Sequence, residues 1–145
     1  MKNKKTGFTI VELLIVIVIV GILVTITVAA YSGLQNRSRD SEKQTDIRNL
    51  AQQLELYYQE KGTYPSFAQL TNSSWRATNI PNTKDALITP PGTSSVSHAN
   101  VKTPSSTQYG YHNEGTCVGS TCTKFHLYWR SDITGSIEVY TGSTG

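Results

Sequence analysis

The feature that most constrains this 145-residue chain is an apolar run that extends from Phe8 to Tyr31. Its 24 residues contain a single charged side chain, Glu12. As an α-helix, at about 1.5 Å per residue, the run would be roughly 36 Å long, which is enough to cross a hydrocarbon layer of about 30 Å with some tilt. Three lysines and no acidic residue precede it. This pattern predicts a single-pass membrane helix whose N-terminus lies on the cytoplasmic side.

Glu12 is the second constraint, because a carboxylate at the centre of a membrane helix costs about 2.5–3.5 kcal/mol. An acid in such a segment is a candidate functional residue that needs a partner. In one interpretation Glu12 reaches the interface and interacts favourably with the positive end of the helix dipole. In the other, a cut between Gly7 and Phe8 creates an amine on Phe8. That amine, from this chain or a neighbouring one, would then neutralise Glu12.

The residues around this position resemble a known processing signal. The Lys-rich leader, Gly7, Phe8 and the sequence Thr9-Ile10-Val11-Glu12 before a long apolar run are similar to the class III signal of type IV pilins and pseudopilins. The resemblance implies that a prepilin peptidase removes residues 1–7 and methylates the new amine of Phe8. It also implies that Glu12 pairs with the N-terminus of an adjacent subunit during filament assembly.

Two other interpretations of the N-terminus remain open. A secretory signal peptide could be cleaved near Val28-Ala29-Ala30, but its apolar region would normally be only about 7–15 residues long. It would also not be interrupted by an acid such as Glu12. A plain membrane anchor that is never processed explains the length of the run, but not the placement of Gly7, Phe8 and Glu12.

The remaining residues, 32–145, are enough for one small extracytoplasmic domain with a single core. The formal net charge of the chain is +3, but three of its 13 basic residues lie in the leader, residues 1–7. Without them, 10 basic side chains face 10 acidic ones. The composition therefore does not indicate nucleic-acid binding, which usually needs a basic excess.

Residues 34–61 are predicted to form an amphipathic helix that continues the apolar one, since no proline occurs between residues 8 and 61. Apolar side chains recur at steps of three and four, the spacing of one helical face: Leu34, Ile47, Leu50, Ala51, Leu54 and Tyr57 or Tyr58. Most charged side chains are expected on the other faces: Arg37, Arg39, Asp40, Glu42, Lys43, Asp46, Arg48 and Glu55. Lys61, Gly62 and Pro65 indicate the helix end.

Residues 62–108 are predicted to be a loop-rich connection. Gly62-Thr63-Tyr64-Pro65-Ser66 resembles a helix exit common in pilin-like proteins, and Tyr64 is expected to fold back onto the helix end. Serine, proline and glycine clusters further on are typical of turns. A few apolar side chains are expected to fix this connection to the core: Trp75, Ile80, Leu87, Ile88 and Val101.

Residues 109–141 are predicted to form a small antiparallel β-meander. Three stretches are rich in aromatic and β-branched residues: 109–114, 124–130 and 136–141. In the second, Phe125, Leu127 and Trp129 share one face; in the third, Ile137 and Val139 lie opposite Glu138 and Tyr140. Asp132-Ile133-Thr134-Gly135 is expected to form the turn between these strands. The predicted fold is thus α+β, with a long N-terminal helix against the meander.

Cys117 and Cys122 lie five residues apart, in the connection between the first two predicted strands. Outside the cytoplasm a disulfide is the expected state, and closing so short a loop would contribute about 2 kcal/mol. The alternative is a metal site that adds His112 and His126. However, the spacing is not a familiar zinc pattern, and His126 is expected on the polar face of its strand.

The sequence predicts no enzyme, cofactor or metal site. It contains no G-x-S-x-G, P-loop or H-E-x-x-H motif. Some pseudopilins bind calcium near the C-terminus, and Asp132 and Glu138 would be the candidate ligands here, but no such site is predicted.

The resemblance implies a structural subunit of a type IV pilus or related filament. Its partners would be other copies or other pilins, the prepilin peptidase, the assembly machinery and, before assembly, membrane lipid. It would reside in the cytoplasmic membrane and then in a filament outside it. Two alternatives stay open: a pseudopilin of a type II secretion or DNA-uptake system, and a membrane-tethered binding domain that does not polymerise.

Overall fold

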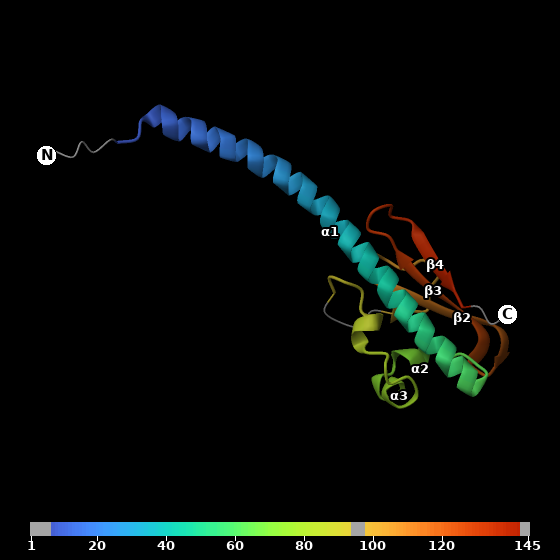
Figure 1. Ribbon diagram of the computed structural model, residues 1–145. Helices are drawn as coiled ribbons and strands as arrows, with labels where there is room; N and C mark the ends of the chain where they lie inside the picture. Colours follow the sequence, from blue (N-terminus) through green and yellow to red (C-terminus); the bar gives the residue numbers. More distant parts are fainter. Residues whose placement is uncertain (1–6, 94–97, 143–145) are drawn as a thin grey trace. The chain divides into compact units, whose positions relative to one another are not determined.

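The computed structural model describes residues 7–93 and 98–142 (Figure 1). It divides into two compact units, Met1–Gln35 and Asn36–Gly145. Helix α1 (Ile10–Lys61) runs without interruption through both, as the absence of proline predicted.

In the first unit, α1 is apolar on every side. The large apolar side chains from Phe8 to Leu34 are all more than half exposed, and Leu34, predicted to start the core stripe, is 65% exposed. A helix that is apolar all round is typical of a membrane span or of the interior of an assembly. By length and composition, α1 can cross a membrane.

The end of α1 follows the predicted signals. The helix ends at Lys61, and Gly62 adopts a left-handed φ of 72°. The amide of Gly62 donates to the carbonyl of Tyr58 at 2.7 Å, which satisfies one of the free carbonyls of the last turn. Tyr64 then folds back as expected: it is fully buried, and its ring stacks on Tyr58 with centroids 4.6 Å apart.

The connection after α1 is more regular than predicted. It contains helices α2 (Phe67–Thr71) and α3 (Ser73–Asn79), the 3-10 helix η1 (Asp85–Ile88) and the short strand β1 (His98–Ala99). Ser66 forms a capping box with Gln69, and the side chain of Asn72 caps α3 by accepting from the amide of Trp75 at 3.0 Å. Polar residues that indicated turns are therefore helix caps.

Most of the apolar residues expected to anchor this connection do so. Ile80 and Ile88 are buried, and Trp75 packs against the core. Leu87 is only partly buried, and Val101, at 37% exposed, lies outside the core.

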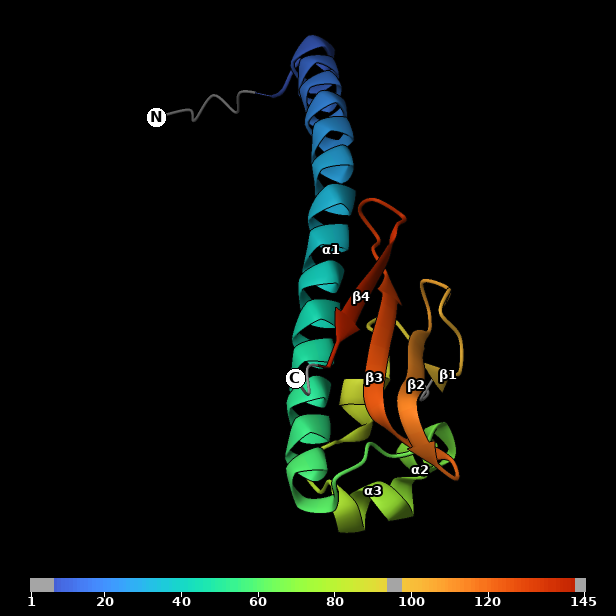
Figure 2. The same ribbon diagram turned by 90° about the vertical axis from the view of Figure 1, so that its right-hand side faces the viewer.

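The sheet has four strands in the order β1-β2-β3-β4, which lie side by side in Figure 2. β2 (Tyr109–Val118), β3 (Thr121–Arg130) and β4 (Ile137–Thr141) form the predicted antiparallel meander. β1, which lies before the predicted meander, pairs with β2 in parallel, so the complete sheet is mixed. β2 continues past Glu114 through a register shift, where Gly115 has a left-handed φ of 95°.

The sequence predicted the alternation of β4 but not which of its two faces is the inner one. Tyr140 is paired with Leu127, which is fully buried, and packs against the core, whereas Val139 is 53% exposed. Alternation alone does not say which of two alternating sets faces inward. The register with β3 determines the inner face of β4, and it places the ring of Tyr140, rather than the smaller side chain of Val139, toward the core.

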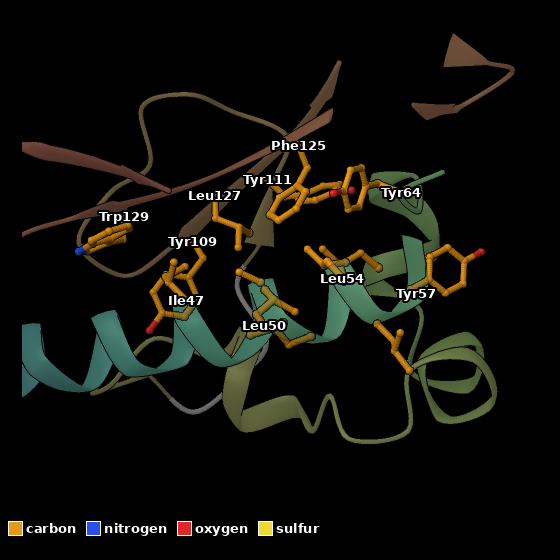
Figure 3. Close-up of a cluster of buried hydrophobic side chains, with 14 residues drawn as sticks. Ile47, Leu50, Leu54, Tyr57, Tyr64, Tyr109, Tyr111, Phe125, Leu127 and Trp129 are labelled. Atoms are coloured by element: carbon orange, nitrogen blue, oxygen red, sulfur yellow. The ribbon is translucent and has the colours of Figure 1, made fainter. Parts of the chain in front are cut away.

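The core of the second unit lies between α1 and the sheet (Figure 3). Ile47, Leu50 and Leu54 supply the helix side, and the predicted face of Phe125, Leu127 and Trp129 supplies the sheet side. Tyr109 and Tyr111 fill the space between them and are fully buried. Burying each large side chain contributes about 1.5–3 kcal/mol, so this contact is the main stabilising element of the fold.

Candidate functional site

The candidate site lies where helix α1 begins. Thr9 directly precedes the first helical residue, Ile10, and forms a reciprocal cap with Glu12. The Thr9 amide and the Thr9 hydroxyl each donate to Glu12 Oε2 at 2.8 Å, and the Glu12 amide donates to Thr9 Oγ1 at 3.3 Å. This is a capping box, which satisfies amides that would otherwise have no partner at the helix start.

The capping box gives Glu12 a role that the sequence reasoning missed. The signal was present as a T-x-x-E pattern before an apolar run, but Glu12 was considered only as a partner of the helix dipole or of an amine. Both hydrogen bonds to the carboxylate end on Oε2, and within the described residues Oε1 accepts none. One carboxylate oxygen is therefore left for a further donor.

Gly7 and Phe8, the residues of the predicted cleavage point, lie outside the helix. Both are exposed, with Phe8 at 85%, and no atom lies within 4 Å of a Cβ built on Gly7. A peptidase needs an accessible backbone, and Gly7 and Phe8 are exposed and not helical. After a cut here, the new amine of Phe8 would be one residue away from the Thr9 amide that already binds Glu12.

Within the second unit, Asp40 and Lys43 fasten α1 to the turn between β3 and β4. Asp40 accepts from the Ser131 hydroxyl at 2.5 Å and from the Asp132 amide at 2.7 Å. Lys43 Nζ donates to the Arg130 carbonyl at 3.0 Å and to Asp132 Oδ1 at 2.8 Å. The predicted turn after Arg130 is thereby held on the helix through three consecutive residues, 130–132.

The expectation that Asp40 and Lys43 lie on the outer faces of α1 was wrong. They are 6% and 1% exposed. Residues 40, 43, 47, 50 and 54 follow one another at steps of three and four, so the buried stripe simply continues with a polar pair. Their charges are tolerated because each is matched by donors or acceptors of the turn.

The surroundings of Asp40 favour its charged form. Burial alone would raise its pKa, but hydrogen bonds from Ser131 and from the amides of Asp132 and Ile133, together with the charge of Lys43, outweigh burial. The pKa of Asp40 is therefore lowered from its ordinary value.

Two further groups, both partly buried, have shifted pKa values. Burial lowers the pKa of His98 to about 4, although its bond to the Ile88 carbonyl opposes the shift. Burial raises the pKa of Asp46, and the 3.0 Å hydrogen bond from the Tyr109 hydroxyl only partly offsets this. Both belong to the packing of the domain and lie in its second unit.

The structure contains the predicted disulfide between Cys117 and Cys122, whose Cα atoms are 4.0 Å apart. The two cysteines are direct partners across β2 and β3 rather than members of a loop between strands. The alternative metal partners are engaged elsewhere: His112 contacts Asn100, and His126 contacts Glu114 at 2.6 Å. Within the described residues, no group of His, Cys, Asp and Glu is arranged to hold a metal ion.

The two acids considered for calcium do not share a site. Asp132 pairs with Lys43 at 2.8 Å, whereas Glu138 accepts from the Ser136 hydroxyl.

Comparison with known proteins identifies the N-terminal segment. Residues 2–28 match the prokaryotic N-terminal methylation motif. The chain is 37% identical over 65 residues to the type IV major pilin protein PilA of Myxococcus xanthus, covering 45% of this chain and 30% of that protein. It is 35% identical over 67 residues to the type II secretion system core protein G of Vibrio cholerae (46% of each chain). It is 38% identical over 66 residues to the fimbrial protein EcpC of Eikenella corrodens (46% of this chain, 43% of that protein).

These matches confirm the resemblance to type IV pilins and pseudopilins. The chain carries the methylation motif of that class of proteins, followed by a long helix packed against a small sheet. It spans less than half the length of the three relatives named above. No solved structure matches it significantly.

Proposed function

We propose that this chain is a structural subunit of a type IV pilus or pilus-like filament. The observation that carries the proposal is the methylation motif at residues 2–28, joined to a helix that is apolar on every side. Such a helix must be covered by lipid or by other helices. A subunit that passes from a membrane into a polymer satisfies this requirement in both states.

In this proposal the chain is first a single-pass protein of the cytoplasmic membrane, with its N-terminus inside. A prepilin peptidase cuts between Gly7 and Phe8 and methylates the amine of Phe8. The exposed, non-helical conformation of both residues supports this step.

Assembly then places the apolar helices of many copies side by side. Because lipid tails are as apolar as these side chains, burial alone gives little driving force, and packing and polar pairing must supply it. Glu12 provides the polar pairing. The cap keeps its carboxylate beside the start of the helix, and within the described residues Oε1 accepts no hydrogen bond. The Phe8 amine of an adjacent copy would pair with it.

A second candidate is a pseudopilin of a type II secretion system. The similarity to core protein G of Vibrio cholerae favours it specifically. Its partners would be the secretion machinery and other pseudopilins, and its filament would stay within the cell envelope. Long surface filaments that contain this chain would favour the pilus, and their absence in a secreting cell would favour the pseudopilin.

The deciding experiment is mass spectrometry of the N-terminal peptide of the chain purified from its native membrane. We expect a methylated Phe8 as the first residue. In a Gly7→Val variant, where a bulky side chain occupies the cleavage position, we expect the chain to start at Met1. A wild-type start at Met1 would leave a plain anchor, and a start near Ala30 would indicate a secreted domain; either result would refute the proposal.

A further inference from the structure

The two halves of the disulfide lie in different surroundings. Cys117, on β2, is exposed, and the next residue, Val118, is 74% exposed. Cys122, on β3, is only 4% exposed. Its carbonyl accepts from the amide of Tyr64 at 2.7 Å, so the segment after α1 lies directly against it.

This difference decides which sulfur a thiol can reach. Thiol–disulfide exchange begins when a thiolate attacks one sulfur, and access to that sulfur is one determinant of its rate. The attacking group approaches along the line of the S–S bond, from the side opposite the leaving sulfur. An attacking thiolate can therefore approach Cys117, which is exposed. Cys122 is covered by the fold, which blocks this approach to its sulfur.

We propose that Cys117 is the cysteine through which this chain exchanges with a dithiol oxidoreductase, and that Cys122 is its resolving cysteine. In reduction, the enzyme thiolate bonds to Cys117 Sγ, the bond between Cys117 and Cys122 breaks, and its electron pair leaves on Cys122, which takes up a proton. The second enzyme thiolate then attacks its own partner sulfur and releases Cys117 as a thiolate.

Oxidation is the reverse sequence, with the enzyme supplying the disulfide. The Cys117 thiolate attacks the enzyme disulfide, and the Cys122 thiolate then attacks Cys117 Sγ and expels the enzyme as a thiolate. Two other contacts of the hairpin keep the cysteines close while they are reduced. The Thr116 amide donates to Thr123 Oγ1 at 3.1 Å, and Asn113 Nδ2 donates to the Ser120 carbonyl at 2.9 Å.

The stability of the leaving thiolate opposes this assignment, and its effect on the rate can be compared with the effect of access. A buried thiolate is less stable than an exposed one, so Cys122 is the poorer leaving group. If leaving groups respond to pKa as attacking thiols do, this slows the attack on Cys117 by about threefold per pKa unit. A covered sulfur, in contrast, cannot be attacked until the hairpin opens. Access therefore decides.

The first test uses the full chain in detergent micelles with one cysteine at a time. Cys122→Ser leaves Cys117, and Cys117→Ser leaves Cys122. Each variant is mixed with oxidised glutathione, and formation of the mixed disulfide is followed by mass. Since access sets the rate, we expect the chain with Cys117 to react faster by about tenfold. In guanidinium, where burial is lost, the two rates should become similar.

The second test keeps both cysteines, so it does not depend on how the variants fold. The oxidised chain is treated with a dithiol enzyme whose second active-site cysteine is replaced by serine, quenched with acid and digested. Because no Lys or Arg lies between the two cysteines, a tryptic peptide carries both, and its fragmentation between residues 118 and 121 locates the link. We expect the enzyme on Cys117. Linkage to Cys122, equal linkage to both, or the same distribution in the folded and the denatured chain would overturn the proposal. The proposal about Cys117 does not depend on whether the chain polymerises.

Discussion

Asp40 shows how a single acidic side chain can belong to a protein core. Its carboxylate accepts three hydrogen bonds from residues 131–133, and Lys43 lies nearby on the same helix. The charge is stabilised by these donors more than burial penalises it, so the turn after β3 depends on Asp40 being ionised. That dependence has a measurable pH signature.

Because the pKa of Asp40 is lower in the folded state than its ordinary value of 3.8, its contribution is present above that value and is lost as pH falls through the folded pKa. Asp40→Asn should lower the free energy of unfolding by about 1–3 kcal/mol at pH 7, since an amide cannot replace all three acceptor contacts. Urea denaturation of the full chain in detergent, followed by tryptophan fluorescence, would measure this. The two proteins should converge below pH 3.8, and a constant difference down to pH 2 would contradict the assignment.

His98 differs from Asp40, because the fold favours its neutral form rather than its charged form. Its folded pKa of about 4 lies below its ordinary value of 6.5, so stability present above pH 6.5 is lost as pH falls toward 4. The shift is worth about 3 kcal/mol at most. His98→Asn retains a donor for the Ile88 carbonyl but does not titrate between these values. We expect the variant to lose less stability than the wild type between pH 7 and pH 4 in the same denaturation experiment; equal losses would show that His98 is not the responsible group.

At the scale of elements, the end of α1 is set by one backbone conformation. Gly62 has a φ of 72°, which a residue with a Cβ adopts only with strain. Gly62→Ala should therefore destabilise the domain by about 1 kcal/mol or more. Gly33, inside α1, has ordinary helical geometry and open space around it, so Gly33→Ala is the matched control and should be neutral or stabilising. Thermal unfolding would compare them, and equal shifts in Tm would contradict this account.

The same elements show what local sequence patterns can predict. The run from Phe8, the apolar stripe through Leu50 and the stop at Gly62 are local signals, and the structure has them where they were expected. The inner positions of Asp40 and Tyr140 were not predictable in this way, because each depends on a partner far along the chain. Ser131 lies 91 residues after Asp40, and the register with β3 sets the face of Tyr140.

A third group of features was local but was overlooked. Ser66 and Gln69 have the spacing of a capping box, Asn72 precedes α3 as a cap, and Thr9 and Glu12 repeat the box at the start of α1. Serine and asparagine favour turns and helix starts for the same physical reason, since their side chains satisfy free amides. After α1, the sequence therefore indicated breaks without saying whether a helix followed each one.

At the scale of the whole molecule, the two units differ in whether their apolar side chains are buried. The second closes its apolar side chains around one core, whereas the first leaves its own exposed along the helix. The single charged group on that apolar stretch is Glu12, and two roles compete for it. A cap needs only an acceptor oxygen at this position, while pairing with the Phe8 amine of another copy needs a negative charge.

Glutamine separates these roles, because it also completes a capping box but carries no charge. If Glu12 serves assembly through its charge, Glu12→Gln should be cleaved after Gly7 like the wild type but form few or no filaments. Thr9→Val, which removes the hydroxyl of the cap and keeps the charge, should retain assembly and weaken only the first turn of α1, by about 1 kcal/mol. Electron microscopy and sedimentation of sheared filaments, with the N-terminal peptide mass as the check on processing, would compare the two variants. Normal filaments from Glu12→Gln, together with their loss in Thr9→Val, would mean that the capping box, and not the charge, is what assembly requires of Glu12.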